Sequence, residues 1–358
     1  MAFPAESTSF LAPLAPWFEA HRRALPWRAL DLDQPHPDPY GVLVSELMLQ
    51  QTQVATVVPY FERWMKALPD IQALAQAPED QVHKLWEGLG YYRRARFLQA
   101  AAKAIQAQGW PKDLEGLSAL PGLGPYTAAA LAAIAFQWPE PALDGNAFRV
   151  LARLLKIEAD PKARASELRA WLRPALVAHG PSRLTQALME LGASHCARRA
   201  QCGFCPMKDR CLAWEAGLVD QIPPVAIRAK VRQIEVRLMA LRAGDRFLVN
   251  APAPSGLLAG LWGWPFQEAA PPGISFAAET TREYSTVNVQ ELPGWTQVYT
   301  HRRETIHPLL MDVAAPFSPA DTQRWVSAQE LEALPMGKRD QRLRDLVLRG
   351  KPRTSLRT

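Results

Sequence analysis

The sequence predicts a mainly α-helical N-terminal domain followed by a smaller α/β domain. Through the first 220 residues, apolar side chains recur at the three- and four-residue spacing of helices, as in 54–68 and 95–105. After residue 232 the spacing changes to two: Ile234, Val236 and Leu238 alternate with polar residues, as in a strand. Since 358 residues are long enough for two cores, we expect a helical domain over 7–220, a basic linker over 221–232 and a second domain over 233–350.

Composition and charge narrow the class of protein. The longest apolar run, 128–136, is too short to cross a bilayer, and the first twenty residues contain no Lys or Arg. We therefore expect a cytoplasmic protein without a membrane partner. The net charge of +6 and pI of about 9.2 favour an anionic partner such as DNA, although many soluble proteins are mildly basic.

A glycine-containing hairpin precedes the most apolar helix of the chain. Pro121-Gly122-Leu123-Gly124 opens the Ala-rich stretch 125–136, and its glycines allow backbone angles and close approach that a Cβ would prevent. The free N–H groups at the start of that helix would suit a phosphate. Asp144 follows in a turn-prone Asp-Gly-Asn step.

One acid lies in an otherwise apolar helical segment. Glu46 occurs in YGVLVSELMLQQTQV (40–54), and helical spacing would place Gln50 and Gln53 on its face. A buried carboxyl group has a raised pKa, which suits it to donate a proton. The alternative is a structural Glu that pairs with a nearby polar group.

All four cysteines fall within residues 196–211, with the spacing C-x5-C-x2-C-x5-C. Two disulfides are not expected in a cytoplasmic protein, because thiols stay reduced there. Four thiolates can instead bind either zinc or an iron–sulfur cluster.

Several motifs occur together and in order: VSELMLQQTQVATVVPYFERW, GLGYYRRARFL, LPGLGPYTAAAL, LDGNAFRVLAR and MELGASHC. In this combination the chain resembles the adenine DNA glycosylases of the MutY type. These are helix-hairpin-helix glycosylases with two helical lobes, an iron–sulfur cluster loop and a Nudix-like C-terminal domain. The resemblance extends into the second domain through SGLLAGLWGWPFQE (255–268).

The resemblance implies a role for each acid. Glu46 would protonate adenine, and Asp144 would stabilise the oxocarbenium ion at the sugar, as in a retaining glycosidase. Tyr126 and Asn146 match positions that support this catalytic site. Tyr126 replaces the Lys nucleophile of bifunctional relatives, which implies base removal without strand cleavage.

The resemblance also implies binding residues. Arg23, Trp27 and Glu190 match positions that line an adenine pocket, with core packing as the alternative for Trp27. The matches to DNA-contacting positions are Gln50, Gln51, Tyr91, Gly122, Gly124, Arg198 and Arg199. Arg93, Arg94 and Arg96 are further candidates for phosphate contact, with a solvated helix face as the alternative.

For the cysteines, the resemblance implies a [4Fe–4S] cluster on Cys196, Cys202, Cys205 and Cys211. The first gap is one residue shorter than in the family, which shortens the loop with Arg198 and Arg199. In the second domain, Thr300 and His301 match a motif that recognises 8-oxoguanine, with packing at a strand end as the alternative for His301.

We therefore expect a monomeric glycosylase of base excision repair that acts on duplex DNA with adenine opposite 8-oxoguanine or guanine; the sequence identifies no protein partner. One alternative is an endonuclease III-like pyrimidine or mismatch thymine glycosylase. Another is a non-catalytic iron–sulfur DNA-binding protein.

Overall fold

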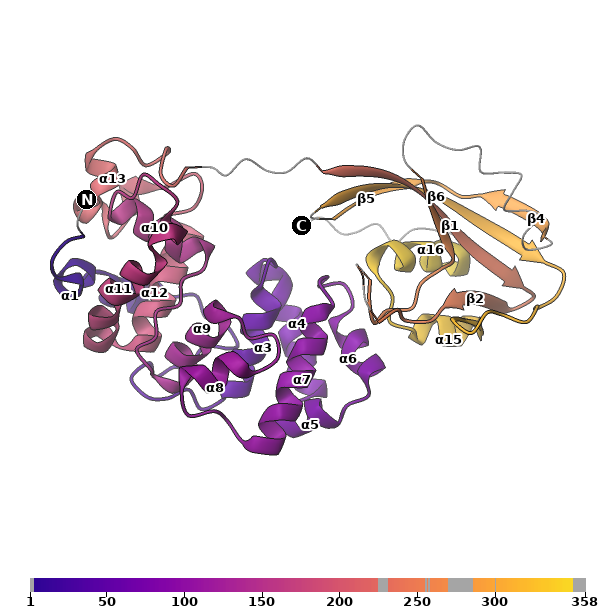
Figure 1. Ribbon diagram of the computed structural model, residues 1–358, viewed down its shortest axis with the longest axis horizontal. Coiled ribbons are helices and arrows are strands. Elements are labelled where there is room, and N and C mark those ends of the chain that lie inside the picture. The colour runs from indigo at the N-terminus through magenta and orange to yellow at the C-terminus, as the bar shows by residue number, and fades with distance from the viewer. Residues whose placement is uncertain are drawn as a thin grey trace. The chain divides into compact units, whose positions relative to one another are not determined.

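The computed structural model describes residues 3–224, 231–254, 256, 258–269, 286–299 and 301–349. The chain forms two compact units, one of residues 1–77 and 97–226 and one of residues 78–96 and 227–358. The first unit is helical, and the second is built on a β-sheet with helices that include α6, α15 and α16 (Figure 1). The predicted fold class, a mainly α domain followed by a smaller α/β domain, is confirmed.

The helical unit contains most of the helices of the described chain. They are α1 Ser7–Leu11, α2 Leu14–His21, α3 Pro39–Leu49, α4 Val54–Ala67, α5 Ile71–Gln76, most of α7 Arg93–Gln108, α8 Leu114–Ala119, α9 Pro125–Phe136, α10 Gly145–Leu154, α11 Ala165–His179, α12 Pro181–Ser194 and α13 Leu212–Glu215. Short 3-10 turns lie at Pro161–Arg164, Cys202–Phe204 and Lys208–Arg210.

Local sequence explains where several of these helices begin. Proline occupies the first turn of α3, α9 and α12, where its missing N–H costs no hydrogen bond. Asp38 and Asp144 cap α3 and α10 by accepting a backbone N–H of the first turn. The proline and aspartate signals therefore set the start of each helix that contributes to the site described below.

The core of the helical unit explains why α9 is apolar on every side. Residues Thr127 to Ala135 of α9 are all buried, so no face of this helix needs polar side chains. A second cluster joins α10, α11 and α12 through Leu151, Leu172 and Leu188. The acids and amides of the site lie at helix ends and on the faces between these packed elements.

The second unit includes a helical segment from the first half of the chain. In this segment, which contains α6 Glu79–Trp86, the Tyr92 hydroxyl donates to the Met336 carbonyl at 3.2 Å and Lys84 Nζ donates to the Glu332 carbonyl at 2.9 Å. Tyr92 is buried, as expected of a core aromatic. Arg94 is buried too and contacts the Trp86 ring, so it is neither the phosphate contact nor the solvated side chain considered above.

The sheet of the second unit is mixed. Its strands are β1 Arg232–Ala243, β2 Arg246–Asn250, β3 Phe266–Ala269, β4 Thr286–Glu291, β5 Trp295–Val298, β6 Arg302–Val313 and β7 Gln323–Ser327. The order is β4-β6-β1-β2-β7, with β3 paired to β1 and β5 paired to β6. Only the long β1 and β6 pair in parallel among these strands; every other pairing is antiparallel.

Apolar residues cover both faces of this sheet. One face packs with α15 Ala328–Ala333 and α16 Lys338–Arg349 around Trp264, which is fully buried. The opposite face carries a second cluster that includes Met239, Leu248 and Met311. In the described parts of the chain, no helix is both long and apolar enough to cross a membrane.

Candidate active site

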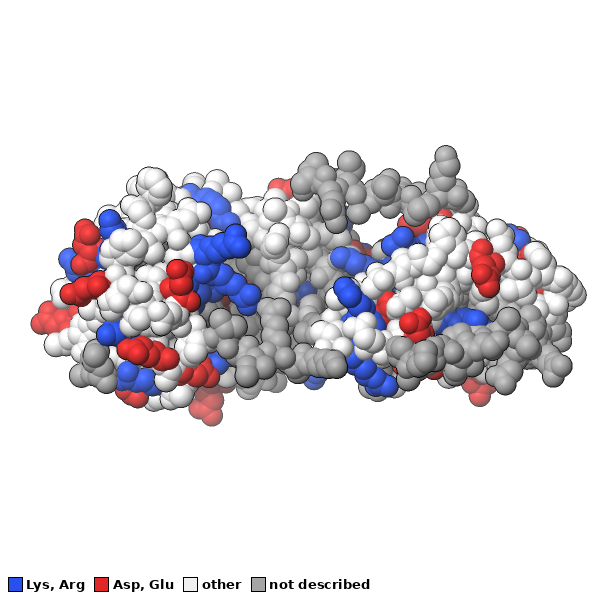
Figure 2. Space-filling view, turned by 90° about the horizontal axis from the view of Figure 1, so that it is seen from above, with Lys and Arg blue, Asp and Glu red and all other residues white. Residues whose placement is uncertain are grey.

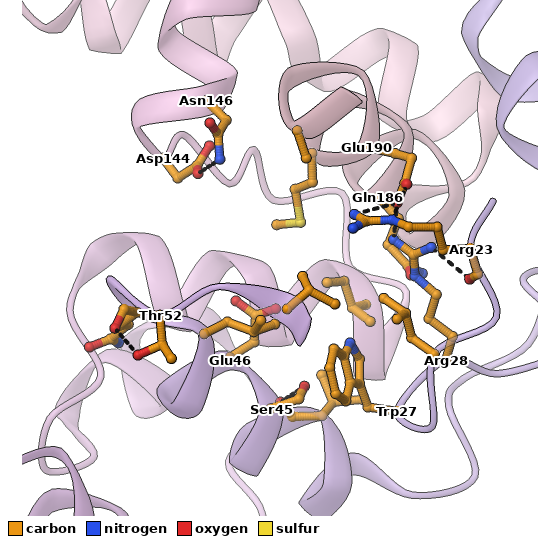
Figure 3. Close-up of a pocket in the computed structure, with 18 of the residues that line it drawn as sticks. Arg23, Trp27, Arg28, Ser45, Glu46, Thr52, Asp144, Asn146, Gln186 and Glu190 are labelled. Carbon is orange, nitrogen blue, oxygen red and sulfur yellow. Dashed lines mark hydrogen bonds and ion pairs between the residues drawn. The ribbon is translucent and has the colours of Figure 1, made fainter. Parts of the chain in front are cut away.

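The helical unit contains a cavity of about 670 Å³. Its walls come from the segment after α2, from α3 and the turn behind it, from α9, from the start of α10 and from α12 (Figure 3). The predicted catalytic and adenine-pocket residues all line it: Arg23, Trp27, Glu46, Tyr126, Asp144, Asn146 and Glu190. Positions separated by up to 167 residues in sequence are thus brought to one place.

Glu46 lies on α3 and is almost completely buried. Burial raises its pKa, the Tyr126 hydroxyl partly opposes this by donating to Oε2 at 3.1 Å, and the result is a pKa of about 7. Tyr126 remains a donor because burial raises its own pKa well above the usual value. Near neutral pH, Glu46 can therefore hold a proton and give it away.

Asp144 lies at the N-terminus of α10, where its carboxylate has two defined partners. Oδ1 accepts the backbone N–H of Ala147 at 2.6 Å, and Oδ2 accepts the Asn146 side-chain amide at 2.9 Å. Figure 3 shows this pair at the start of α10, across the cavity from Glu46. The two carboxyl groups therefore belong to one site and have different surroundings.

A third acid, Glu190 on α12, is held by two arginines. Arg23 Nε and Nη2 contact its two oxygens at 2.5 and 3.2 Å, and Arg28 Nη2 contacts Oε2 at 2.6 Å. Burial acts to raise the pKa of Glu190, but the hydrogen bonds from both arginines outweigh burial and lower it. Glu190 is therefore a fixed anion that faces the cavity together with two cationic donors.

Trp27 was considered above either as a pocket residue or as a core residue, and its position is compatible with both. Its ring is 8% exposed and packs edge-on against Phe61, with 5.3 Å between ring centroids. The same side chain lines the cavity. The residue thus packs in the core and forms part of the pocket wall.

The turn after α3 differs from the expectation. Helix α3 ends at Leu49, Gln50 is its C-terminal cap and Gln51 adopts a positive φ of 57°, so Glu46, Gln50 and Gln53 do not share a helix face. The chain reverses here through a turn in which the Thr52 N–H bonds the Leu49 carbonyl. Gln50, Gln51 and Gln53 nevertheless all line the cavity, and Gln50 also donates to the Thr127 hydroxyl at 3.1 Å.

The hairpin between α8 and α9 contains two different glycines. Gly122 has φ +78°, and a Cβ there would overlap the Phe97 side chain. Gly124 has an ordinary φ of −70° and open space around the missing Cβ, so the expectation of a special backbone angle is wrong at this position. Gly124 instead leaves the N–H groups of α9 accessible, because no side chain caps them.

The four cysteines are free thiols that line a second, small cavity. Burial raises the pKa of Cys205 to about 11, and it also raises the pKa of Cys202 and Cys211. Within the residues that the structure describes, no three Cys, His, Asp or Glu side chains are close enough to hold a single metal ion. The thiols therefore face one space without the spacing of a one-ion site.

Two arginines of α10, which the sequence analysis did not single out, support the cysteine loop. Arg149 donates to the carbonyls of Cys196 and Gly192 at 2.8 Å each and to Asn146 Oδ1 at 2.9 Å. Arg153 is buried and donates to the Ala197 carbonyl at 2.7 Å. The signal was present: two cations four residues apart on a helix whose neighbouring residues are apolar.

The remaining candidates lie at the surface. Arg198 and Arg199 are exposed in the shortened loop after Cys196, and Figure 2 shows Lys and Arg side chains gathered over part of the helical unit. Tyr91 is 47% exposed with a positive φ of 49°. His301 is exposed beside β6, whereas Thr300 is outside the described residues, as is half of the predicted linker (225–230).

Comparison with known proteins finds a matching family for each of the two parts of the chain. Residues 44–174 match the HhH-GPD superfamily of base excision DNA repair proteins, and residues 237–346 match the NUDIX domain. Over 58% of the chain, the fold is similar to that of a thermostable thymine-DNA glycosylase, with a TM-score of 0.50, 24% identity and 96% of that chain covered. At this identity the likeness concerns the fold alone.

The relatives compared by sequence are named adenine DNA glycosylase. The Rattus norvegicus protein is 34% identical, and the match covers 85% of this chain and 68% of that protein. The Schizosaccharomyces pombe protein is 30% identical, and the match covers 92% of this chain and 87% of that protein. The Arabidopsis thaliana protein is 34% identical over 84% of this chain, which spans 56% of its length. The chain spans 43% of the Mus musculus protein. By sequence similarity, the chain belongs to the adenine DNA glycosylase family.

Proposed function

We propose that the chain is a monofunctional glycosylase that hydrolyses the N-glycosidic bond of adenine in duplex DNA and leaves an abasic site. One observation carries the proposal: Glu46, with a pKa of about 7, and the hydrogen-bonded Asp144 line the same cavity. Cleavage of this bond needs a proton on the departing base and negative charge beside the sugar carbon. The two acids supply one each.

The reaction would proceed in three steps. A flipped adenine enters the cavity, and Glu46 gives its proton to the base. The bond between the base and C1′ then breaks, with its electron pair leaving on adenine, while Asp144 stabilises the positive charge on the sugar. Water finally adds to C1′ and loses a proton, which restores the acid.

The pocket residues support adenine as the base. Glu190 can accept from an exocyclic amine, while Arg23 and Arg28 can donate to ring nitrogens. Trp27 supplies an apolar wall. A site with fixed polar partners of this kind discriminates strongly against bases that leave those partners unpaired.

The absence of an amine nucleophile supports simple hydrolysis. Bifunctional glycosylases form a Schiff base through a lysine. Tyr126 occupies the position in question and bonds to Glu46, and none of the described residues that line the cavity is a lysine. Strand cleavage should therefore require added alkali.

Duplex DNA is the proposed partner, with adenine opposite 8-oxoguanine or guanine. The open N-terminus of α9 behind Gly124 and the exposed Arg198 and Arg199 would contact phosphates. Gln50, Gln51 and the exposed Tyr91 would fill or wedge the stack beside the flipped base. In the second unit, we assign recognition of the opposite base to Thr300 and His301.

We further propose that the four cysteines hold a [4Fe–4S] cluster. Four cysteine side chains that line one cavity provide the thiolate ligand set that such a cluster uses. When bound, the cluster would cross-link the loop that presents the exposed Arg198 and Arg199, and the hydrolysis needs no redox step. Iron and sulfide analysis distinguishes it from zinc, which would bring no sulfide.

The test is single-turnover excision on duplexes with adenine opposite 8-oxoguanine, guanine or thymine. We expect cleavage only after hot alkali, and fastest opposite 8-oxoguanine. Glu46→Gln should abolish excision and retain DNA binding, whereas the matched change Glu62→Gln, at an exposed acid of α4, should change neither. Full activity in Glu46→Gln would refute the assignment of the acid.

A further inference from the structure

The second unit buries an unusual number of charges beneath the β5–β6 turn. Glu304 on β6 and Asp340 on α16 are 0% exposed, and Arg339 on α16 is 2% exposed. Charged side chains are almost never fully buried unless they are paired. These three groups, with Arg302 and Glu268, form what we call the buried ion chain.

The members of the buried ion chain alternate in sign and connect three elements. Glu268 of β3 pairs with Arg302 Nη1 at 3.0 Å, Arg302 pairs with Glu304, and Glu304 Oε2 lies 3.6 Å from Arg339 Nη1. Arg339 Nε then contacts Asp340 Oδ2 at 3.2 Å. Asp340 is itself anchored, because its Oδ1 accepts the backbone N–H of Trp264 at 2.9 Å.

Arg302 links the buried ion chain to the turn that carries His301. The Arg302 carbonyl accepts the Tyr299 N–H at 2.8 Å and so closes the turn, and its guanidinium lies 5.7 Å from the Tyr299 ring centroid. The His301 carbonyl accepts the Arg232 N–H of β1 at 3.2 Å. The exposed His301 side chain therefore projects from a turn whose next residue is fixed by buried charges.

Stability alone does not explain this arrangement. Glu304 pairs in register with Ile234 of β1 and is followed two residues later by Ile306, both of them buried, so an apolar residue would suit its position. Replacing a buried ion pair by well-packed apolar residues is often neutral or stabilising, because the charges must be desolvated. What charged partners add is a defined geometry, and in some proteins buried ionic groups are retained for that reason.

We propose that the buried ion chain positions Tyr299, His301 and Arg302 between β5 and β6 and thereby sets the preference for the base opposite adenine. The inference rests on the proposed function, in which His301 at this turn contacts that base. Glu304 and Arg339 are thus positioning residues that act through Arg302, and they touch no DNA. Their removal should loosen the turn without reducing the chemistry at Glu46.

The test uses the full chain with Glu304→Leu, Arg339→Met and Asp340→Asn combined, so that Arg302 keeps Glu268 and no buried charge is left without its partner. We expect the melting temperature of the second unit to be unchanged or higher and the Tyr299 amide to exchange faster. The ratio of excision rates for adenine opposite 8-oxoguanine and opposite guanine should fall on the order of tenfold. The rate opposite guanine should stay as in the parent protein.

Two further variants make the outcomes distinguishable. Asp312→Asn removes another ion pair of β6, the 2.7 Å contact with Arg242, and should leave the ratio unchanged. His301→Ala should abolish the preference; if it does not, or if the parent protein shows no excision, the proposed function fails and this inference fails with it. If His301→Ala acts as expected but the triple variant keeps both the ratio and the amide protection, the buried ion chain is structural only and the proposal is overturned.

Discussion

The hydrogen bond from Tyr126 to Glu46 should set the upper pH limit of the enzyme. Glu46 must be protonated to act as the acid, so activity is present below its pKa and is lost as the pH rises through it. The structure gives a pKa of about 7, raised by burial and partly lowered again by the Tyr126 hydroxyl. Tyr126→Phe removes the lowering contribution, so the pKa should rise further.

The size of the shift in the pKa of Glu46 follows from the strength of its hydrogen bond with Tyr126. A hydrogen bond to a charged group contributes about 1.5–3 kcal/mol, and the lower end suits a distance of 3.1 Å. At 1.36 kcal/mol per pKa unit, the midpoint should move up by about one pH unit. The assay is kcat/KM for excision between pH 5 and 9, which reports the pKa of the free enzyme.

A control variant separates this shift in pH dependence from a general loss of activity. Tyr60→Phe alters a tyrosine of α4 that does not line the cavity, and its alkaline limb should coincide with that of the parent protein. An alkaline limb in Tyr126→Phe that stays in place or moves to lower pH would refute the reasoning, whatever the absolute rate.

Three further predictions concern stability and coupling. At pH 8, Glu46→Gln should stabilise the helical unit against urea by up to about 3 kcal/mol, because a folded-state pKa raised from 4.5 to about 7 lowers stability progressively between those pH values; near pH 4 the difference should vanish. Gly122→Ala should lower the unfolding free energy by more than about 1 kcal/mol because of its positive φ and crowding, whereas Gly124→Ala should leave it unchanged and weaken DNA binding in a titration. Arg149→Met should reduce the single-turnover rate at saturating DNA more than it reduces DNA affinity, since it removes bonds to Asn146 and to the Cys196 carbonyl; an unchanged rate would show that the loop and the acid are independent.

The sequence predicted the main elements because their signals are local. Helical spacing, the proline and aspartate caps and the alternation in β1 each depend on neighbours within one turn or strand. The two acids that we propose as the catalytic pair were noticeable in the sequence, since Glu46 lies in an apolar helix and Asp144 in a capping position. That Arg23 and Glu190 line the same cavity was predicted only through resemblance, because they meet across 167 residues.

Where the sequence misled, a tertiary contact outweighed a local pattern. Gln50 and Gln53 fit a helical spacing with Glu46, but the chain adopts a positive φ at Gln51 without a glycine to signal it. Arginine usually lies at the surface, yet contacts with Trp86 and the Gly90 carbonyl hold Arg94 inside the second unit. No pattern within a few residues of Glu304 indicates that its carboxylate is paired inside a core.

Asp144 has two structural roles, and this affects how inherited or engineered variants at the position should be interpreted. Its carboxylate caps α10 and also faces the cavity. Loss of an N-terminal cap costs about 0.5–2 kcal/mol, so replacement by a non-capping residue should lower protein abundance as well as the catalysis that we propose for Asp144. Asn retains the cap and removes only the charge. A mutational survey that measures both quantities should therefore separate Asn from Ala and Val, which a survey of activity alone would place in one class.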